Sequence, residues 1–132
     1  MNILFHLPNA TLQKCFRPVD LDRLRQKNTL LINPVENSDS LLEAYRMHAA
    51  DANALVTGWG TPPIILEMLD QAPRLKVIVH SAGSIRGLIP PETWKRGIRV
   101  GTANEALGIG VAETTLGMII AGLKGFFPGQ AR

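Results

Sequence analysis

The stretch KVIVHSAGSIRGLIP, residues 76–90, carries the clearest fold signal in the chain. Its apolar run VIV (77–79) predicts a buried β-strand, which ends abruptly in the small and polar residues HSAGS (80–84). In open parallel sheets, ligands bind beyond the carboxyl ends of the strands. The stretch therefore predicts one strand of such a sheet, with a candidate ligand site in the loop that follows it.

Strand-like and helix-like segments alternate along the whole chain. Strands are expected at 2–7, 29–33, 53–57, 74–80 and 98–102, and helices at 19–27, 40–50, 63–71, 91–97 and 110–124. The expected helix caps are Asn37, Ser38 or Asp39 for 40–50, and Thr61 with Pro62 for 63–71. Five alternations with short connections predict an α/β fold with a doubly wound, parallel, five-stranded sheet in the flavodoxin-like order.

Composition bounds the class of protein. The length of 132 residues fits one domain, and 45% apolar residues is ordinary for a globular chain. A net charge of +3 without a nucleic-acid motif argues against nucleic-acid binding. The single Cys15 fits a reducing, cytoplasmic location. The N-terminus lacks a basic region and a long apolar run, and the apolar stretch 111–123 is shorter than the roughly 20 residues of a membrane span, so no membrane association is expected.

The loop after the fourth expected strand supplies the candidate site residues. Gly83 permits close approach of a ligand because it has no Cβ, and Ala82, Gly83 and Ser84 offer successive N–H groups to a carboxylate. Arg86 is a candidate anion clamp, while His80 and Trp59 end or follow neighbouring strands. An ordinary strand-to-loop turn explains the same residues without any ligand. The three histidines lack metal-ligand spacing, so no metal site is expected.

The last expected helix has two unusual features. Its apolar residues cover nearly the whole circumference, which predicts burial against a partner surface, and hence a homo-oligomer. Gly108 and Gly110 form half of a dinucleotide fingerprint, but the third position is Glu113, whose carboxylate would repel a pyrophosphate. No acidic residue follows at the distance that the ribose requires. The fingerprint is therefore rejected.

Residues 74–124 resemble a known family. The strand with its small-residue loop, the run WKRGIRV (94–100) and the run VAETTLGMI (111–119) match, in order and spacing, the N-terminal part of the D-isomer-specific 2-hydroxyacid dehydrogenases. Residues 1–73 match only in pattern. The resemblance implies a flavodoxin-like substrate-binding domain over 1–109, and the start of an interdomain helix over 110–132.

The resemblance also implies a function. Family members interconvert 2-hydroxy and 2-keto acids with NAD or NADP, which implies that Ala82, Gly83 and Ser84 hold the substrate carboxylate. It also implies that Gly83 and Val111 border the cofactor. The family's Rossmann NAD-binding domain, with its catalytic Arg, Glu and His, follows the long helix, so this chain looks truncated before that domain. It is therefore expected to be inactive alone. Leu107 stands where many members have Asn, and Asn104 where Pro is common.

Two other function classes compete with this reading. A truncated product could act as a non-catalytic binding or dimerisation module of the same fold. A response-regulator-like domain would need an acidic cluster at the ends of the first and third strands, where the chain has His6, Leu7, Thr57 and Gly58. That class is therefore disfavoured.

Overall fold

The computed structural model describes residues 1–32 and 38–126 of the chain. Five parallel strands form one sheet in the order β2-β1-β3-β4-β5. The strands are β1 (Asn2–Phe5), β2 (Thr29–Ile32), β3 (Ala54–Thr57), β4 (Val77–His80) and β5 (Arg99–Thr102). The expectation of a doubly wound, flavodoxin-like α/β sheet is confirmed.

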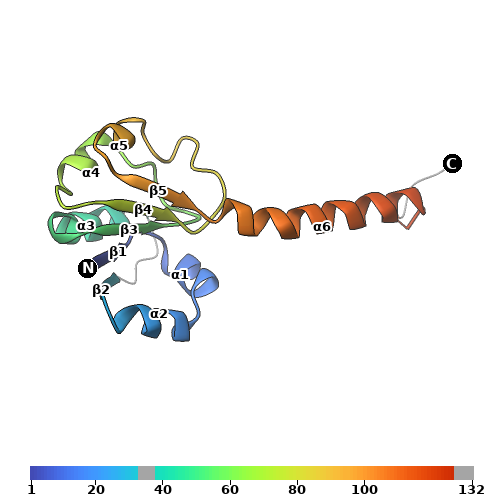
Figure 1. Ribbon diagram of the computed structural model, residues 1–132, viewed down its shortest axis with the longest axis horizontal. Helices are drawn as coiled ribbons and strands as arrows, with labels where there is room; N and C mark the ends of the chain where they lie inside the picture. Colours follow the sequence, from blue (N-terminus) through green and yellow to red (C-terminus); the bar gives the residue numbers. More distant parts are fainter. Residues whose placement is uncertain (33–37, 127–132) are drawn as a thin grey trace.

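Helices lie on both sides of this sheet. They are α1 (Asn9–Cys15), α2 (Pro18–Arg25), α3 (Ser38–His48), the 3-10 helix η1 (Ala49–Asp51), α4 (Leu66–Asp70), α5 (Glu92–Lys95) and α6 (Asn104–Leu123). Figure 1 shows α1 and α2 on one side of the sheet, α3, α4 and α5 on the other, and α6 extending away from it.

Successive strand residues point to opposite faces, so each strand divides its apolar residues between two cores. The first face packs against α3 and α4 in a cluster centred on Tyr45 and Met68. Its strand residues are Leu4, Leu31, Leu55, Ile78 and Val100. The second face packs against α1 and α2 through Leu12 and Leu24. Its strand residues include Ile3, Phe5, Leu30, Ile32, Ala54, Val56 and Val77.

Several expected boundaries were wrong. Strand β1 ends at Phe5 rather than Leu7, and α1 was not expected at all. Residues 61–65 are not helical, so Thr61 does not cap α4, which begins after Ile65. The Thr61 hydroxyl instead accepts from the Gly58 N–H and donates to the His6 carbonyl, so it joins two loops. The candidate cap Asn37 lies outside the described residues.

The long apolar helix at the end of the described chain is confirmed, but it starts earlier than expected. Helix α6 begins at Asn104, so residues 104–109 are helical rather than part of a loop. The domain boundary at residue 109 and the role of α6 between domains stay predictions.

The full length of α6 also corrects the expectation that its apolar stretch is too short to span a membrane. With 20 residues, α6 is long and apolar enough to cross a membrane by length and composition. Glu113 lies near its midpoint, where a charged side chain costs on the order of 3 kcal/mol in a bilayer. A single helix of this kind is weak evidence for a span.

Candidate functional site

The loop at 81–87 follows β4, which lies between β3 and β5 in the sheet. Ser81 fixes the start of the loop, because its N–H and its hydroxyl both donate to the Thr57 carbonyl at 2.8 Å. The neighbouring loop after β3 packs closely against Ser81. A Cβ on Gly58 would lie 2.8 Å from the Ser81 Oγ and 3.1 Å from the Thr11 Cγ2. The first turn of the loop is therefore held rigidly by the end of β3.

A second contact ties the loop to the start of α6. The Ala103 N–H donates to the Ala82 carbonyl at 3.0 Å and to the His80 carbonyl at 3.1 Å. Ala82 itself is only 2% exposed. Among the described residues, the N–H groups of Ala82, Gly83 and Ser84 donate to no protein acceptor. The loop thus carries three successive backbone N–H groups without a protein acceptor, while the carbonyls of Ala82 and Ile85 accept hydrogen bonds.

A hollow of about 570 Å³ opens beside these donors. Its lining residues are Gly83, Ser84, Ile85, Arg86, Ile89, Trp94, Thr102 and Asn104. Arg86 is exposed and forms no ion pair within the described ranges. Its backbone N–H donates to the Ser84 hydroxyl at 3.2 Å, which curls the loop around the hollow. The hollow therefore combines free amides, one guanidinium and an apolar wall.

Gly83 lies close to the start of α6. A Cβ at this position would lie 3.1 Å from the Asn104 Oδ1 and 3.9 Å from the Leu107 Cδ1. The 3.1 Å contact is tighter than ordinary van der Waals contact, and the Asn104 amide would have to yield. A larger side chain at 83 would therefore fill the space above the free amides.

The candidate His80 lies beneath the loop and not in the hollow. Its side chain points into the first face, where its Nδ1 and the Thr57 hydroxyl form a 2.9 Å hydrogen bond. Burial lowers the pKa of His80, so the neutral ring is favoured. His6 directly follows β1, on the other side of β3, and burial lowers its pKa to about 4. Its ring stacks edge-on against Tyr45, 5.3 Å away between centroids.

Trp59 is half exposed and does not line the hollow around Gly83. Its carbonyl accepts from the Thr11 hydroxyl at 2.9 Å, so its loop leans on α1. Val111 lies on the exposed surface of α6, beside a separate shallow hollow. The structure thus brings together Gly83, Ser84 and Arg86, with Ala82 directly beneath them.

Sequence reasoning missed Trp94, Thr102 and Asn104 as lining residues. Trp94 was read only as part of the run that leads into β5. Gly97, at φ +74°, ends the short helix α5 that carries Trp94, and it returns the chain to β5. The sequence carries no signal for this role, since the half exposure of Trp94 on a four-residue helix is seen only in the structure.

Two kinds of site find no support in the described residues. No group of three or more His, Cys, Asp or Glu side chains there lies close enough to hold a metal ion. Gly108 and Gly110 lie inside α6 rather than in a strand-to-helix loop. Their backbone N–H groups are within the helix, so they cannot cradle a pyrophosphate.

The fold and the loop define an α/β domain with unpaired backbone amides at the end of a central strand. No protein-family model matches the chain. A glyoxylate/hydroxypyruvate reductase of Arabidopsis thaliana is 30% identical over 94 residues, which are 71% of this chain and 29% of that protein. The chain therefore spans under a third of the length of this curated relative.

Solved structures give the same picture. A phosphoglycerate oxidoreductase from Rhizobium etli matches with a TM-score of 0.66 at 21% identity, over 91% of this chain and 36% of that one, which shows the fold alone. A protein from Pyrococcus horikoshii matches with a TM-score of 0.66 at 26% identity, over 91% and 32%. A putative D-3-phosphoglycerate dehydrogenase from Ralstonia solanacearum matches at 0.55 and 25%, over 75% and 29%. Sequence and fold together relate the chain to the D-isomer-specific 2-hydroxyacid dehydrogenases, with which it shares about a third of their length.

Proposed function

We propose that this chain is the substrate-binding part of an oxidoreductase that acts on D-2-hydroxy acids and 2-keto acids. The observation that carries the proposal is the loop at 81–87, in which three successive N–H groups are free beside Arg86. Similarity to a glyoxylate/hydroxypyruvate reductase supports the same substrate class. Charge-assisted hydrogen bonds from backbone amides and a guanidinium are the strong contacts for a carboxylate.

The residues of the chain bind and orient the acid rather than transform it. The amides of Ala82, Gly83 and Ser84 hold the carboxylate, and Arg86 approaches it from the rim of the hollow. Trp94 and Ile89 exclude water from the rest of the acid. His80 supports the loop from beneath through Thr57, whereas Trp59 lies outside the hollow, on the loop that leans on α1.

Hydride transfer needs NAD or NADP, and the described residues do not form a cradle for it. We propose that a separate NAD-binding domain supplies the cofactor beyond α6, with Gly83 and Val111 on the nicotinamide side. The isolated chain should then reduce no 2-keto acid and bind neither cofactor tightly. An absorbance assay over glyoxylate, pyruvate and hydroxypyruvate, with NADH and NADPH, tests this, and isothermal titration with each cofactor accompanies it. Turnover above the uncatalysed background would refute it.

Substrate binding by the isolated chain is the direct test of the loop. Titration with glyoxylate or hydroxypyruvate should shift the NMR amide signals of Ala82, Gly83 and Ser84. The Arg86→Gln variant should weaken the affinity by about tenfold or more, because a hydrogen bond to a charged group contributes about 1.5–3 kcal/mol. Arg74→Gln is the matched control, since Arg74 is exposed and pairs with Asp51 away from the hollow. Equal effects of the two variants would contradict the assignment.

Gly83→Val tests the close approach itself. The valine Cβ would meet the Asn104 Oδ1, and its methyl groups would occupy the space above the amides. Acid binding should fall below detection while the far-ultraviolet circular dichroism stays unchanged. Unaltered affinity in a folded Gly83→Val variant would show that the acid does not use this loop.

The exposed α6 favours a second candidate, a non-catalytic binding or dimerisation module in the cytoplasm. An apolar helix without cover suits a chain that assembles with another copy. Reading the coding DNA past Arg132 separates the two candidates. A G-x-G-x-x-G run downstream supports the enzyme, and an immediate stop codon supports the module.

A further inference from the structure

The hollow beside the loop at 81–87 is larger than a two- or three-carbon acid requires. Its volume of about 570 Å³ lies in the range of roughly 300–1,000 Å³ that is typical of pockets for much larger ligands. The free amides of the loop and Arg86 engage only the carboxylate end of an acid. The rest of the lining therefore decides which tail the acid carries.

An apolar wall forms one part of that lining, and it is anchored to the core. Ile85, Ile89 and Trp94 are its members. The Ile89 N–H donates to the Ile85 carbonyl at 3.2 Å, so one turn carries both isoleucines. Ile89 is buried in the core of the first face, and Ile85 packs against the same core. The two isoleucines are therefore a fixed surface rather than a mobile rim.

Trp94 completes the apolar wall from α5. Thr93 is fully buried, and its carbonyl accepts from the Ile98 N–H at 3.2 Å, which holds α5 against the domain. Trp94 is the next residue along, yet it is 49% exposed. Tryptophan is highly buried on average, and its ring gains most when another apolar or aromatic group covers it. An apolar tail beside Ile89 would give the indole that cover.

The same lining offers no second cation to a doubly charged acid. Of the described residues that line the hollow, Arg86 alone is charged. At the end of α5, the Lys95 ammonium lies 3.7 Å from the Glu92 carboxylate. The Arg96 guanidinium lies 2.6 Å from the Asp70 carboxylate. A second negative group on the acid would therefore lose hydration at the apolar wall without gaining a partner.

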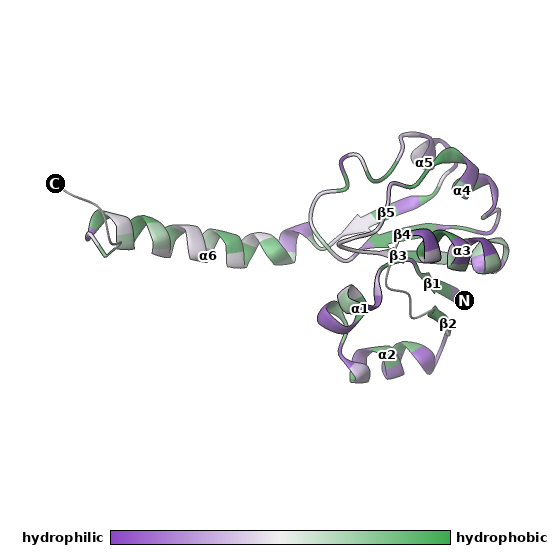
Figure 2. Cartoon of the chain, turned by 180° about the vertical axis from the view of Figure 1, so that it is seen from behind, coloured by the Kyte–Doolittle hydropathy of each residue, from purple (hydrophilic) through white to green (hydrophobic). Residues whose placement is uncertain are grey.

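The polar part of the lining lies by the loop that receives the carboxylate. The Ser84 hydroxyl accepts from the Arg86 N–H, and the Thr102 hydroxyl accepts from the Asn104 N–H at 3.3 Å. Figure 2 shows α6 running away from the sheet, and of its described residues Asn104 alone lines the hollow. Asn104 lies close to Gly83. The polar groups thus gather around Gly83, and the apolar wall is left for the tail.

From this division we infer that the acid bound here carries an apolar tail, branched or aromatic, which lies on Trp94 and against Ile85 and Ile89. The inference rests on the proposed function and narrows it to one class of 2-keto and 2-hydroxy acids. Acids with an isobutyl or benzyl tail are preferred to pyruvate and glyoxylate, and acids with a second carboxylate are not. Trp94 is then a residue that determines specificity.

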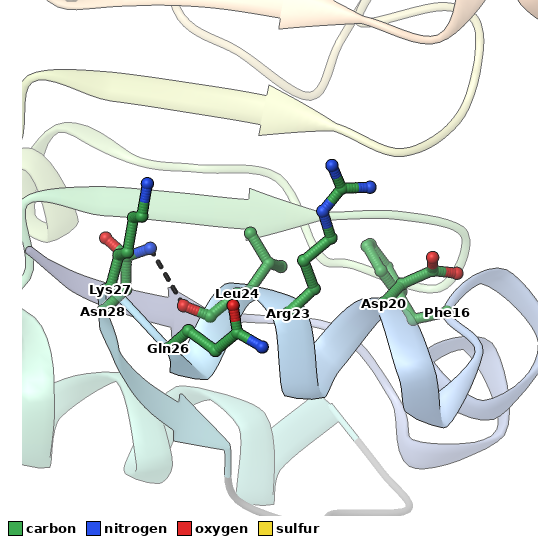
Figure 3. A pocket seen from close by; sticks show the side chains of 7 residues that line it. All are labelled: Phe16, Asp20, Arg23, Leu24, Gln26, Lys27 and Asn28. Carbon is green, nitrogen blue, oxygen red and sulfur yellow. Dashed lines mark hydrogen bonds between the residues drawn. The ribbon is translucent and has the colours of Figure 1, made fainter.

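A second hollow attracts acids by charge and has to be separated from this one. It measures about 740 Å³ beside α2, where Figure 3 shows Arg23 and Lys27 on the same side as Leu24. Neither Arg23 nor Lys27 forms an ion pair within the described chain. Apart from Phe16 and Leu24, its lining side chains are polar or charged, so it favours an anion but not an apolar tail. Arg23→Gln therefore reports acid that binds beside α2.

Isothermal titration of the chain with a series of 2-keto acids tests the inference. One methylene in a hydrophobic pocket changes discrimination by about 10–200-fold, so 4-methyl-2-oxopentanoate and phenylpyruvate should bind at least about tenfold more tightly than pyruvate. Oxaloacetate, which has a second carboxylate, should bind no more tightly than pyruvate. Trp94→Ala should remove the preference for the tailed acids, whereas Trp94→Phe keeps an aromatic ring and should retain most of it. Trp59→Ala is the matched control, because Trp59 is also half exposed but lies outside the hollow.

Fluorescence reads the same contact without truncating the indole. The chain has two tryptophans, so Trp94 is the only one in a Trp59→Phe variant. Its emission should shift to the blue when 4-methyl-2-oxopentanoate binds, because the tail displaces water from the ring. Binding with no change in this emission would show that the tail lies elsewhere.

Other outcomes would also overturn the inference. They are equal affinities for pyruvate and phenylpyruvate, tighter binding of oxaloacetate, and a preference that is lost in folded Arg23→Gln or Trp59→Ala but kept in folded Trp94→Ala. Circular dichroism verifies the folding of each variant. Failure of the proposed function looks different, since then no acid, tailed or not, shifts the NMR amide signals of residues 82–84, and the inference fails with it. Pyruvate that shifts these signals while the tailed acids bind no better overturns the inference alone.

Discussion

Replacing Gly58 with alanine tests whether the two loops at the site are packed as closely as the structure shows. The new Cβ would lie 2.8 Å from the Ser81 Oγ, about 0.6 Å inside ordinary contact, and 3.1 Å from the Thr11 Cγ2. Among the described residues, positive φ angles occur at other glycines and not at Gly58, so the cost is one of contact rather than of backbone conformation. Two neighbours must therefore move.

The magnitude follows from what those neighbours lose. Displacing the Ser81 hydroxyl breaks its bond to the Thr57 carbonyl, at about 1 kcal/mol, and overpacking against Thr11 costs about 1–3 kcal/mol. Alanine also lowers the conformational entropy of the unfolded chain, which offsets about 0.4–1 kcal/mol of this loss of stability. We expect the free energy of unfolding, measured by urea titration, to fall by about 1–3 kcal/mol.

A double-mutant cycle shows whether Ser81 is the cause. In a Ser81→Ala background the hydroxyl is gone, so Gly58→Ala should cost about 1 kcal/mol less than in the parent chain. Gly108→Ala, where the new Cβ meets nothing within 4 Å, is the control and should not lower stability. An identical cost of Gly58→Ala in both backgrounds would refute the packing argument.

Two further predictions concern the buried polar groups of the first face. Tyr45→Phe removes the hydroxyl that donates to the Met68 carbonyl and should lower the free energy of unfolding by about 1–3 kcal/mol in urea titration; an unchanged midpoint would show that this bond contributes nothing net. Burial lowers the folded pKa of His6 from 6.5 to about 4, so the fold holds the neutral ring. The neutral His6 ring therefore stabilises the fold fully above pH 6.5, and this stability is lost as the pH falls toward 4, by on the order of 3 kcal/mol. His6→Gln should flatten the plot of the free energy of unfolding against pH in this range.

The sheet could be predicted from the sequence because each strand is a short apolar run bounded by turn residues. VIV (77–79) and ALV (54–56) are such runs, and the structure pairs them in register as neighbouring parallel strands. The short helices were harder to predict from the sequence. Helix α1 has no strong cap residue and follows Pro8, and the five-residue α4 is set by packing of Met68 and Leu69 on the first face rather than by its cap. Tertiary packing decided both.

The site could be predicted only where chain neighbours form it. Gly83, Ser84 and Arg86 lie within four residues of one another, and one loop brings them to one hollow. Trp94 and Asn104 reach the same hollow from α5 and α6, by a route that no spacing in the sequence encodes. His80 was expected at the mouth of β4, but strand alternation turns its ring into the first face.

The loop and α6 are mechanically one unit, and this gives the exposed helix a consequence for binding. A single N–H, that of Ala103, holds the carbonyls of both His80 and Ala82, and Asn104 begins α6 one residue later. Gly83 lies against the first turn of α6, through Asn104 and Leu107. A protein surface that packs on α6 fixes the direction of that first turn. It thereby fixes the space above the free amides of Gly83 and Ser84. Whether that surface belongs to a second copy or to a cofactor-binding domain, acid affinity at the loop and assembly through α6 are therefore coupled. A variant that weakens assembly should weaken acid binding too, and by linkage the acid should strengthen assembly by the same factor.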